Sequence, residues 1–148
     1  MTFSTLVIGV GYLGKRYCKL ARDDAHGLTR ADYDLDAGGE LPLELPGDYR
    51  VLYTVPPSRE ARSDVRLERL LAALDPAPRR FVYISTTGVY GDHRGGDVTE
   101  ETAVDPGSGH AALRVAAENT LTEWAARTDC DAVILRVPGI YGPGRLGI

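Results

Sequence analysis

The sequence contains few cysteines, no long hydrophobic run and no excess of basic residues. Its two cysteines, Cys18 and Cys130, are too few for a disulfide framework and lack the spacing of a metal site. No apolar segment approaches the roughly 18 residues that a membrane span requires. The few residues before the first apolar segment contain no basic leader. The formal net charge is −4 and the basic residues are scattered, which disfavours nucleic acid as a partner. We therefore expect a cytoplasmic protein that binds neither nucleic acid nor membrane.

The remaining composition is that of an ordinary globular protein. Hydrophobic residues make up 43% and charged residues 26% of the 148 residues, and no repeat or low-complexity tract interrupts them. A chain of this length buries roughly 68–70% of the surface that its unfolded form exposes, which is enough for one core. We predict a single domain over residues 1–148.

Short apolar runs alternate with helix-length periodic segments along the whole chain. This alternation is typical of βαβ units and predicts an α/β fold, a doubly wound parallel sheet of the Rossmann type with three α/β/α layers. A segment rich in Gly, Pro and Asp, residues 31–47, predicts a loop. The expected strands cover residues 6–9, 26–29, 50–55, 81–85 and 132–137, and the expected helices cover residues 12–22, a segment after Ser58, and 108–127.

Two of these helices have a recognisable buried face. Ser58 is a residue type that caps helices, and four leucines follow it at helical spacing: Leu67, Leu70, Leu71 and Leu74. The last helix is expected to pack through Leu113, Ala117, Leu121 and Trp124.

A G-x-G-x-x-G motif joins the first strand to the first helix. Gly9 permits the tight turn, Gly11 lets the backbone approach a pyrophosphate, and Gly14 lets the helix pack closely on its strand. The helix N-terminus then faces the phosphate charge. We predict that a dinucleotide binds here, with Tyr12 and Leu13 completing the binding turn.

The end of the second strand bears on the choice between NADP and NAD. An acidic residue about 20 positions after the glycines binds the ribose of NAD, whereas an arginine accommodates the extra phosphate of NADP. Thr29 and Arg30 occupy this place, so NADP is the expected cofactor. NAD stays possible, because one of the acidic residues that follow could bind the ribose if the loop folds back: Asp32, Asp34 or Asp36.

Three strand-end and helix motifs carry a family resemblance. GVGYLG, then ISTTGVYG over residues 84–91, then LRVPGIYGPGR over residues 135–145 resemble the atypical extended short-chain dehydrogenase/reductases, the NAD(P)-dependent epimerase/dehydratase group. The resemblance covers nearly the whole chain. It implies an oxidoreductase or a sugar-nucleotide epimerase or dehydratase that uses a nicotinamide dinucleotide.

The same resemblance implies roles for particular residues. The Ser or Thr three positions before the Val of VYG, which binds the substrate oxygen, is Thr86. In the family a Glu follows the Lys of the Tyr-x-x-x-Lys pair by four residues. Counting back from Glu118 therefore places Arg114 at the Lys position and His110 at the Tyr position, so both family residues are replaced. Pro138 and Gly139, which follow the last predicted strand, would touch the nicotinamide end.

The replaced pair still permits chemistry. His110, Arg114 and Glu118 stand four residues apart, so the helix places them in one row. Histidine exchanges protons near neutral pH, and the guanidinium of Arg114 can donate to ribose hydroxyls, although it is no equivalent of a lysine. We expect Glu118 either to hold Arg114 or to lie on the helix surface.

Two classes of function therefore stay open. One is an NADP-dependent oxidoreductase or epimerase-like enzyme with an altered catalytic pair acting on an unidentified small molecule, and the other is a non-catalytic NADP(H)-binding module or inactive family member. In the family the chain continues into a C-terminal substrate domain, which we expect to be absent here. The last strand of this sequence, residues 132–137, would then be an open edge. We therefore expect a homo-oligomer. No metal is expected, because the spacing around His93 matches no known site.

Overall fold

A parallel β-sheet forms the centre of the molecule. The computed structural model describes residues 3–58 and 63–145. In this part of the chain five parallel strands pair in the order β2-β1-β3-β4-β5. Their bounds are Thr5–Ile8 (β1), Ala25–Leu28 (β2), Arg50–Tyr53 (β3), Arg80–Thr86 (β4) and Asp131–Val137 (β5).

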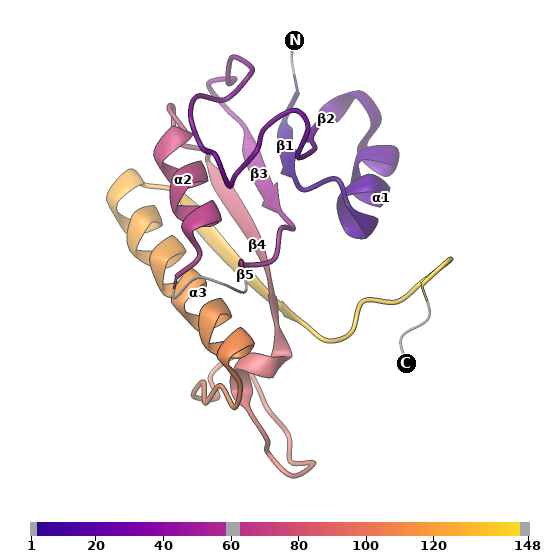
Figure 1. The fold of residues 1–148 in the computed structure, drawn as a ribbon, viewed down its shortest axis with the longest axis vertical. Helices are drawn as coiled ribbons and strands as arrows, with labels where there is room; N and C mark the ends of the chain where they lie inside the picture. Colours follow the sequence, from indigo (N-terminus) through magenta and orange to yellow (C-terminus); the bar gives the residue numbers. More distant parts are fainter. Residues whose placement is uncertain (1–2, 59–62, 146–148) are drawn as a thin grey trace.

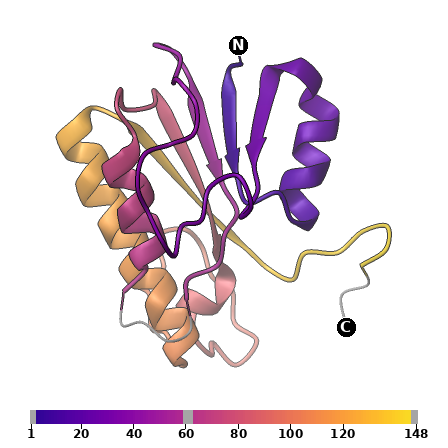
Figure 2. The same cartoon turned by 45° about the horizontal axis from the view of Figure 1, so that its top comes forward.

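Helices cover both faces of this sheet. α1 (Tyr12–Ala21) lies on one face, and α2 (Val65–Ala73) and α3 (Gly109–Thr128) lie on the other, as the two views agree (Figure 1, Figure 2). Two 3₁₀ turns, η1 (Arg22–Asp24) and η2 (Thr87–Tyr90), follow α1 and β4. The predicted three-layer, doubly wound α/β fold is confirmed.

The strand sequences explain where the core sits. Alternate residues of β4, Phe81 and Tyr83, are fully buried in one cluster with Leu67 and Leu121 of the helices that cover that face. The opposite face is buried beneath α1 near β1, but Leu135 of β5 is 43% exposed. β5 therefore lies at an open edge of the sheet, and the oligomer expected from it stays a prediction, to be tested by light scattering at micromolar concentrations.

The helix starts follow from their capping residues, and one prediction is wrong. Ser58 does not cap α2. The cap is Asp64, whose carboxylate Oδ1 accepts a hydrogen bond of 3.2 Å from the backbone N–H of Leu67. α3 begins as expected, because the hydroxyl of Ser108 accepts from the N–H of Ala111 at 3.2 Å.

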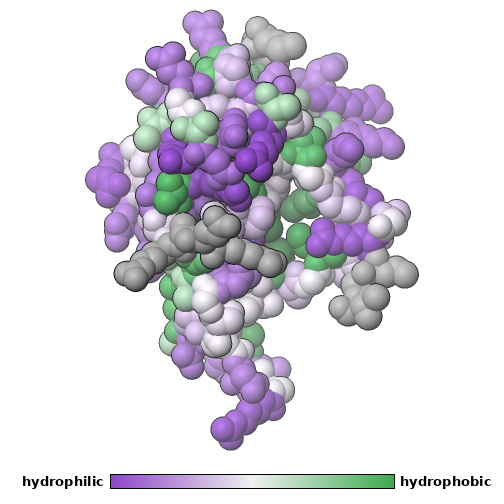
Figure 3. All heavy atoms as spheres, in the orientation of Figure 1, coloured by the Kyte–Doolittle hydropathy of each residue, from purple (hydrophilic) through white to green (hydrophobic). Residues whose placement is uncertain are grey.

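The loop expected over residues 31–47 is found, and a second segment without helix or strand follows η2. Residues 31–47 form turns and bends, although Tyr33 and Leu35 from this segment are buried in the core. The polar segment between η2 and α3 projects from the body (Figure 1), and its tip carries hydrophilic side chains (Figure 3).

The parallel strands bring five connecting segments to one edge of the sheet. Because all strands point the same way, the segments that leave their carboxyl ends lie side by side, and ligands of such sheets bind there. They are residues 9–14, 29–36, 54–58, 86–91 and 138–145. Within the described residues, no helix is long and apolar enough to cross a membrane.

Candidate functional site

The glycine turn between β1 and α1 has the geometry that its motif predicts. Gly9 has a φ of +90°, and a Cβ there would lie 2.7 Å from a methyl carbon of Val55. A Cβ on Gly14 would lie 2.2 Å from the carbonyl oxygen of Gly9, so only glycine lets α1 approach its strand this closely. Nothing lies within 4 Å of a Cβ built on Gly11. The turn is tight on its protein side and open at the N-terminus of α1.

The first cavity, called here the β2 cavity, lies beside this turn. It measures about 150 Å³. Its apolar part comes from Ile8, Leu28, Leu35 and Val55, and its rim carries charged side chains from two segments, Arg30, Asp34, Asp36 and Arg66. A cavity of this size and polarity accommodates an aromatic ring.

Thr29 and Arg30 both lie at the rim of the β2 cavity but contact different carboxylates. The backbone N–H and the hydroxyl of Thr29 both donate to Asp32, at 2.8 and 2.6 Å, and these hydrogen bonds lower the pKa of that carboxyl. Asp32 is therefore committed to its own turn. Arg30 is 74% exposed and pairs with Asp34 at 3.5 Å and with Asp36 at 3.1 Å. It therefore lies at the rim of the β2 cavity, directly after the end of β2.

The second cavity, called here the turn cavity, lies over the glycines. It measures about 220 Å³, and Gly9, Gly11, Tyr12 and Leu13 line it together with Ile84 of β4 and with residues that follow β3 and β5. All the predicted turn residues except Gly14, which packs under the helix, thus face one cavity.

The third cavity, called here the α3 cavity, collects the residues assigned to the reaction. It measures about 360 Å³. Thr86 and His110 line it with Arg114, Pro138 and Gly139, so residues from β4, α3 and the segment after β5 lie around one cavity. The hydroxyl oxygen of Thr86 accepts from the backbone N–H of Gly88 at 3.1 Å, which fixes the start of η2.

Arg114 reaches from α3 to the sheet. Its Nη1 donates to the hydroxyl of Tyr83 at 3.1 Å and to the carbonyl oxygen of Ile84 at 2.9 Å. Burial raises the pKa of Tyr83 to about 12, in spite of the lowering by the neighbouring guanidinium. Arg114 is therefore held against β4, at the edge of the α3 cavity.

Glu118 does neither of the things expected of it. It does not bind Arg114, and at 4% exposure it does not lie on the helix surface. Its carboxylate accepts from Nη2 of Arg136 at 2.7 Å and from the hydroxyl of Ser85 at 2.5 Å. The pKa of Arg136 is raised by this hydrogen bond. Glu118 therefore joins α3 to β4 and β5. The sequence analysis did not predict either of these contacts.

Sequence reasoning also missed Arg145. This side chain lines both the turn cavity and the α3 cavity, and its guanidinium lies 5.3 Å from the ring centre of Tyr12. The segment carrying it is held on α1, because Pro143 accepts hydrogen bonds from the hydroxyl of Tyr12 at 3.3 Å and from Arg16 at 2.5 Å. The sequence did contain a signal for this residue, because Arg145 ends the motif PGIYGPGR. Only the Pro-Gly at the start of that motif was interpreted.

The charge of the α3 cavity has one sign. Its lining contains the guanidinium groups of Arg114 and Arg145 and no carboxylate among the described residues. In the same part of the chain, no three His, Cys, Asp or Glu side chains gather closely enough to hold a metal ion. The cavity suits an anionic group.

The sequence matches a known family over most of this site. Residues 57–147 match the model of the NAD dependent epimerase/dehydratase family. Because the matched segment is more than half of the chain, the chain belongs to this family, as the motifs indicated. The match includes the residues of the α3 cavity from β4 onward, whereas the glycine turn precedes it.

Solved structures share the fold over almost the whole chain. RMD from Pseudomonas aeruginosa complexed with NADPH is 24% identical, with a TM-score of 0.75 over 96% of this chain and 57% of that chain. UDP-glucuronic acid 4-epimerase from Bacillus cereus in complex with NAD is 19% identical, with a TM-score of 0.69 over 95% and 57%. A functionally unknown conserved protein from Silicibacter pomeroyi DSS is 31% identical, with a TM-score of 0.69 over 97% and 55%. The chain thus spans little more than half the length of these proteins.

Proposed function

We propose that this chain binds NADP(H) along the carboxyl edge of its sheet, with NAD(H) as the weaker ligand. One observation carries the proposal: the three cavities adjoin, with the glycine turn at their centre. The β2 cavity and the turn cavity share Gly9 and Val55, and the turn cavity and the α3 cavity share Thr54, Ile84, Ile140 and Arg145. Solved proteins with this fold that hold NADPH or NAD support the same reading.

The residues present fit such a ligand. The β2 cavity has the size and apolar lining for the adenine ring. The open side of Gly11 leaves room for a diphosphate at the N-terminus of α1, where no side chain of the described residues caps the helix. Arg145 supplies a cation beside this place. The nicotinamide end then falls in the α3 cavity, near Pro138 and Gly139.

For the reaction we propose an oxidoreductase or a sugar-nucleotide epimerase or dehydratase with an altered catalytic pair. When bound, the nicotinamide ring exchanges a hydride with the substrate. The hydroxyl of Thr86 accepts from Gly88 and keeps its own proton to donate to a substrate oxygen. His110 exchanges the proton that accompanies the hydride, in the position of the family's tyrosine.

Arg114 takes the position of the family's lysine in this proposal. Its contacts with Tyr83 and Ile84 both use Nη1, whose two hydrogens they occupy. Nη2 keeps its two hydrogens for the ribose hydroxyls of the cofactor. Because the guanidinium is held from the strand side, it is oriented before the cofactor arrives.

A second candidate is a non-catalytic NADP(H)-binding module. The observation in its favour is the same pair of contacts, which gives Arg114 a part in holding α3 to β4 without any reaction. Under this alternative the chain binds the cofactor as tightly, and His110 has no chemical role.

Two measurements separate these possibilities. Calorimetric titration of the full chain with NADPH and with NADH should give one site, tighter for NADPH, and binding of neither would overturn the proposal. The purified chain with NADP⁺ is then offered a panel of nucleoside-diphosphate sugars. Nicotinamide absorbance reports net oxidation, and chromatography of the sugar products reports an epimerase or dehydratase, which returns the hydride. His110→Ala should abolish turnover and leave NADPH binding unchanged; unchanged turnover would remove His110 from its role, and no turnover in the wild type would favour the binding module.

A further inference from the structure

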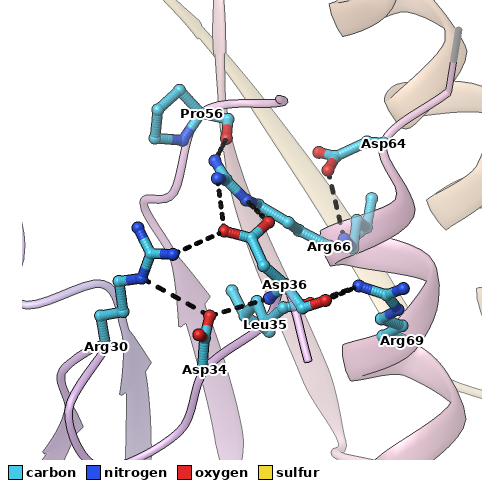
Figure 4. Close-up of polar contacts among 9 residues, drawn as sticks. Arg30, Asp34, Leu35, Asp36, Pro56, Asp64, Arg66 and Arg69 are labelled. Atoms are coloured by element: carbon cyan, nitrogen blue, oxygen red, sulfur yellow. Dashed lines mark hydrogen bonds and ion pairs between the residues drawn. The ribbon is translucent and has the colours of Figure 1, made fainter. Parts of the chain in front are cut away.

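A carboxylate lies between two guanidinium groups at the rim of the β2 cavity (Figure 4). Nε and Nη2 of Arg66 donate to the two oxygens of Asp36 at 2.6 and 2.8 Å. Nη2 of Arg30 donates to Oδ2 of Asp36, the oxygen that also accepts from Nη2 of Arg66, at 3.1 Å. Arg66 comes from the first turn of α2, whereas Arg30 follows β2, so two distant segments converge on one anionic group.

Arg66 is the better oriented of the two cations. Its side chain is 23% exposed, against 74% for Arg30, and its Nη1 also donates to the carbonyl oxygen of Pro56 at 3.4 Å. Asp64 caps the helix immediately before it and fixes where α2 begins. A planar guanidinium held in this way presents two parallel N–H donors, the arrangement that recognises carboxylates and phosphates alike.

The backbone around Asp36 is held independently of its carboxylate. Arg69, one turn further along α2, donates to the carbonyl oxygen of Leu35 at 3.2 Å and to that of Asp36. The N–H of Asp36 donates to Asp34 at 3.0 Å. The segment therefore stays on α2 if the side chain of Asp36 turns away, and the carboxylate is a replaceable occupant of the place between the two arginines.

We propose that Arg66 and Arg30 together bind the 2′-phosphate of NADP(H), and that Asp36 occupies this anion site until the phosphate displaces it. The proposal rests on the proposed binding of the dinucleotide, with its adenine in the β2 cavity. It adds Arg66, 36 residues after Arg30, as a residue that determines cofactor choice. Asp36 then acts as an internal competitor that weakens NADPH binding, and a cofactor without the phosphate leaves the ion pairs intact.

The alternative role for Asp36 predicts the opposite result. If this carboxylate accepted the ribose hydroxyls of NAD(H), its removal would weaken NADH binding and leave no gain for NADPH. Under our proposal Asp36→Asn removes the competing charge, so NADPH binds about tenfold more tightly and NADH changes by less than about twofold.

The test is calorimetric titration of the full chain and its variants with NADPH and with NADH, which differ only in the 2′-phosphate. Arg66→Gln should weaken NADPH binding about tenfold or more and spare NADH, and Arg66→Lys should fall between, because it keeps the charge without the fork. NADH binding by each variant also reports that it is folded. The matched controls are Arg79→Gln and Asp48→Asn, an exposed ion pair of 3.5 Å at the amino edge of the sheet.

The failure of this inference differs from the failure of the proposed function. If the wild type binds neither nucleotide, the dinucleotide site itself is wrong. If it binds both and Arg66→Gln weakens both equally or neither, Arg66 does not read the phosphate. If Asp36→Asn leaves NADPH binding unchanged or weaker, Asp36 is no competitor and the inference is overturned while the dinucleotide site stands.

Discussion

The carboxylate of Glu118 lies 2.7 Å from Nη2 of Arg136, so an ion pair joins α3 to the edge strand β5. The hydroxyl of Ser85 donates to the same carboxylate, and Nη1 of Arg136 donates to the hydroxyl of Tyr90 at 3.0 Å. These contacts connect the helix that carries His110 to the two strands whose ends complete the α3 cavity. The cavity therefore depends on a polar network beneath it.

Glu118→Gln should lower the free energy of unfolding by about 2–3 kcal/mol, because it leaves the guanidinium of Arg136 without its charged partner. The cost stays below that of a fully buried pair, since Arg136 is 23% exposed. Urea denaturation followed by circular dichroism measures it. Glu123→Gln, on the exposed side of the same helix, is the control and should change stability by less than about 0.5 kcal/mol. Equal stability of the two variants would contradict the account.

Gly14→Ala should destabilise the fold by about 1–3 kcal/mol, because its methyl group would meet the carbonyl oxygen of Gly9. Gly109→Ala is the matched control at the start of α3, where nothing lies within 4 Å of the added carbon. That variant should be as stable as the wild type or slightly more so, since alanine favours helix. Thermal unfolding distinguishes them, and equal midpoints would show that α1 does not pack this closely on its strand.

Stability should decline in alkaline solution through buried tyrosines. Burial raises the pKa of Tyr83 to about 12, from an ordinary value of 10.0 that the unfolded chain retains. Between pH 10 and pH 12 the unfolded state therefore loses a proton that the folded state keeps. The stabilisation present below pH 10 is lost through this window by about 1.4 kcal/mol per pH unit for this residue.

Tyr83→Phe tests this dependence. The slope of the unfolding free energy against pH should be shallower above pH 10 in the variant, whatever its stability at neutral pH. Tyr49 and Tyr53, whose pKa values burial also raises, keep part of the slope in both proteins. Identical slopes would mean that Tyr83 ionises as readily in the folded state as in the unfolded state.

Arg145→Gln should weaken NADPH and NADH binding by the same factor, about tenfold, because the diphosphate that the proposal places beside this arginine is common to both. Arg127→Gln, an exposed arginine in the last turn of α3, controls for the loss of charge. Calorimetric titration reads both nucleotides. A change confined to NADPH would place Arg145 at the 2′-phosphate instead.

The fold and the glycine turn could be predicted because they depend on local patterns. Apolar runs, helical spacing and the glycine motif each act within about a dozen residues. The cap of α2 was predicted wrongly at Ser58, since Ser58 and Asp64 are both capping residue types and only the folded backbone decides where the helix begins.

Other parts of the site depend on contacts between distant segments. His110, Arg114 and Glu118 form one row, but each step of four residues rotates about 40° around the helix axis. His110 is therefore exposed, Arg114 half-buried and Glu118 buried, and the row alone does not say which strand receives its last member. The pairing of Arg66 with Asp36 crosses 30 residues and likewise left no local signal.

The binding of NADPH by the wild type and by Gly11→Val tests the central claim most directly, which is that the backbone at the start of α1 receives a diphosphate. A Cβ at position 11 meets no atom within 4 Å, so the variant should fold and lose NADPH binding by at least about tenfold. Gly47→Val, at a glycine with equal free space in the loop before β3, should bind as the wild type does. Undiminished binding by Gly11→Val would contradict the account.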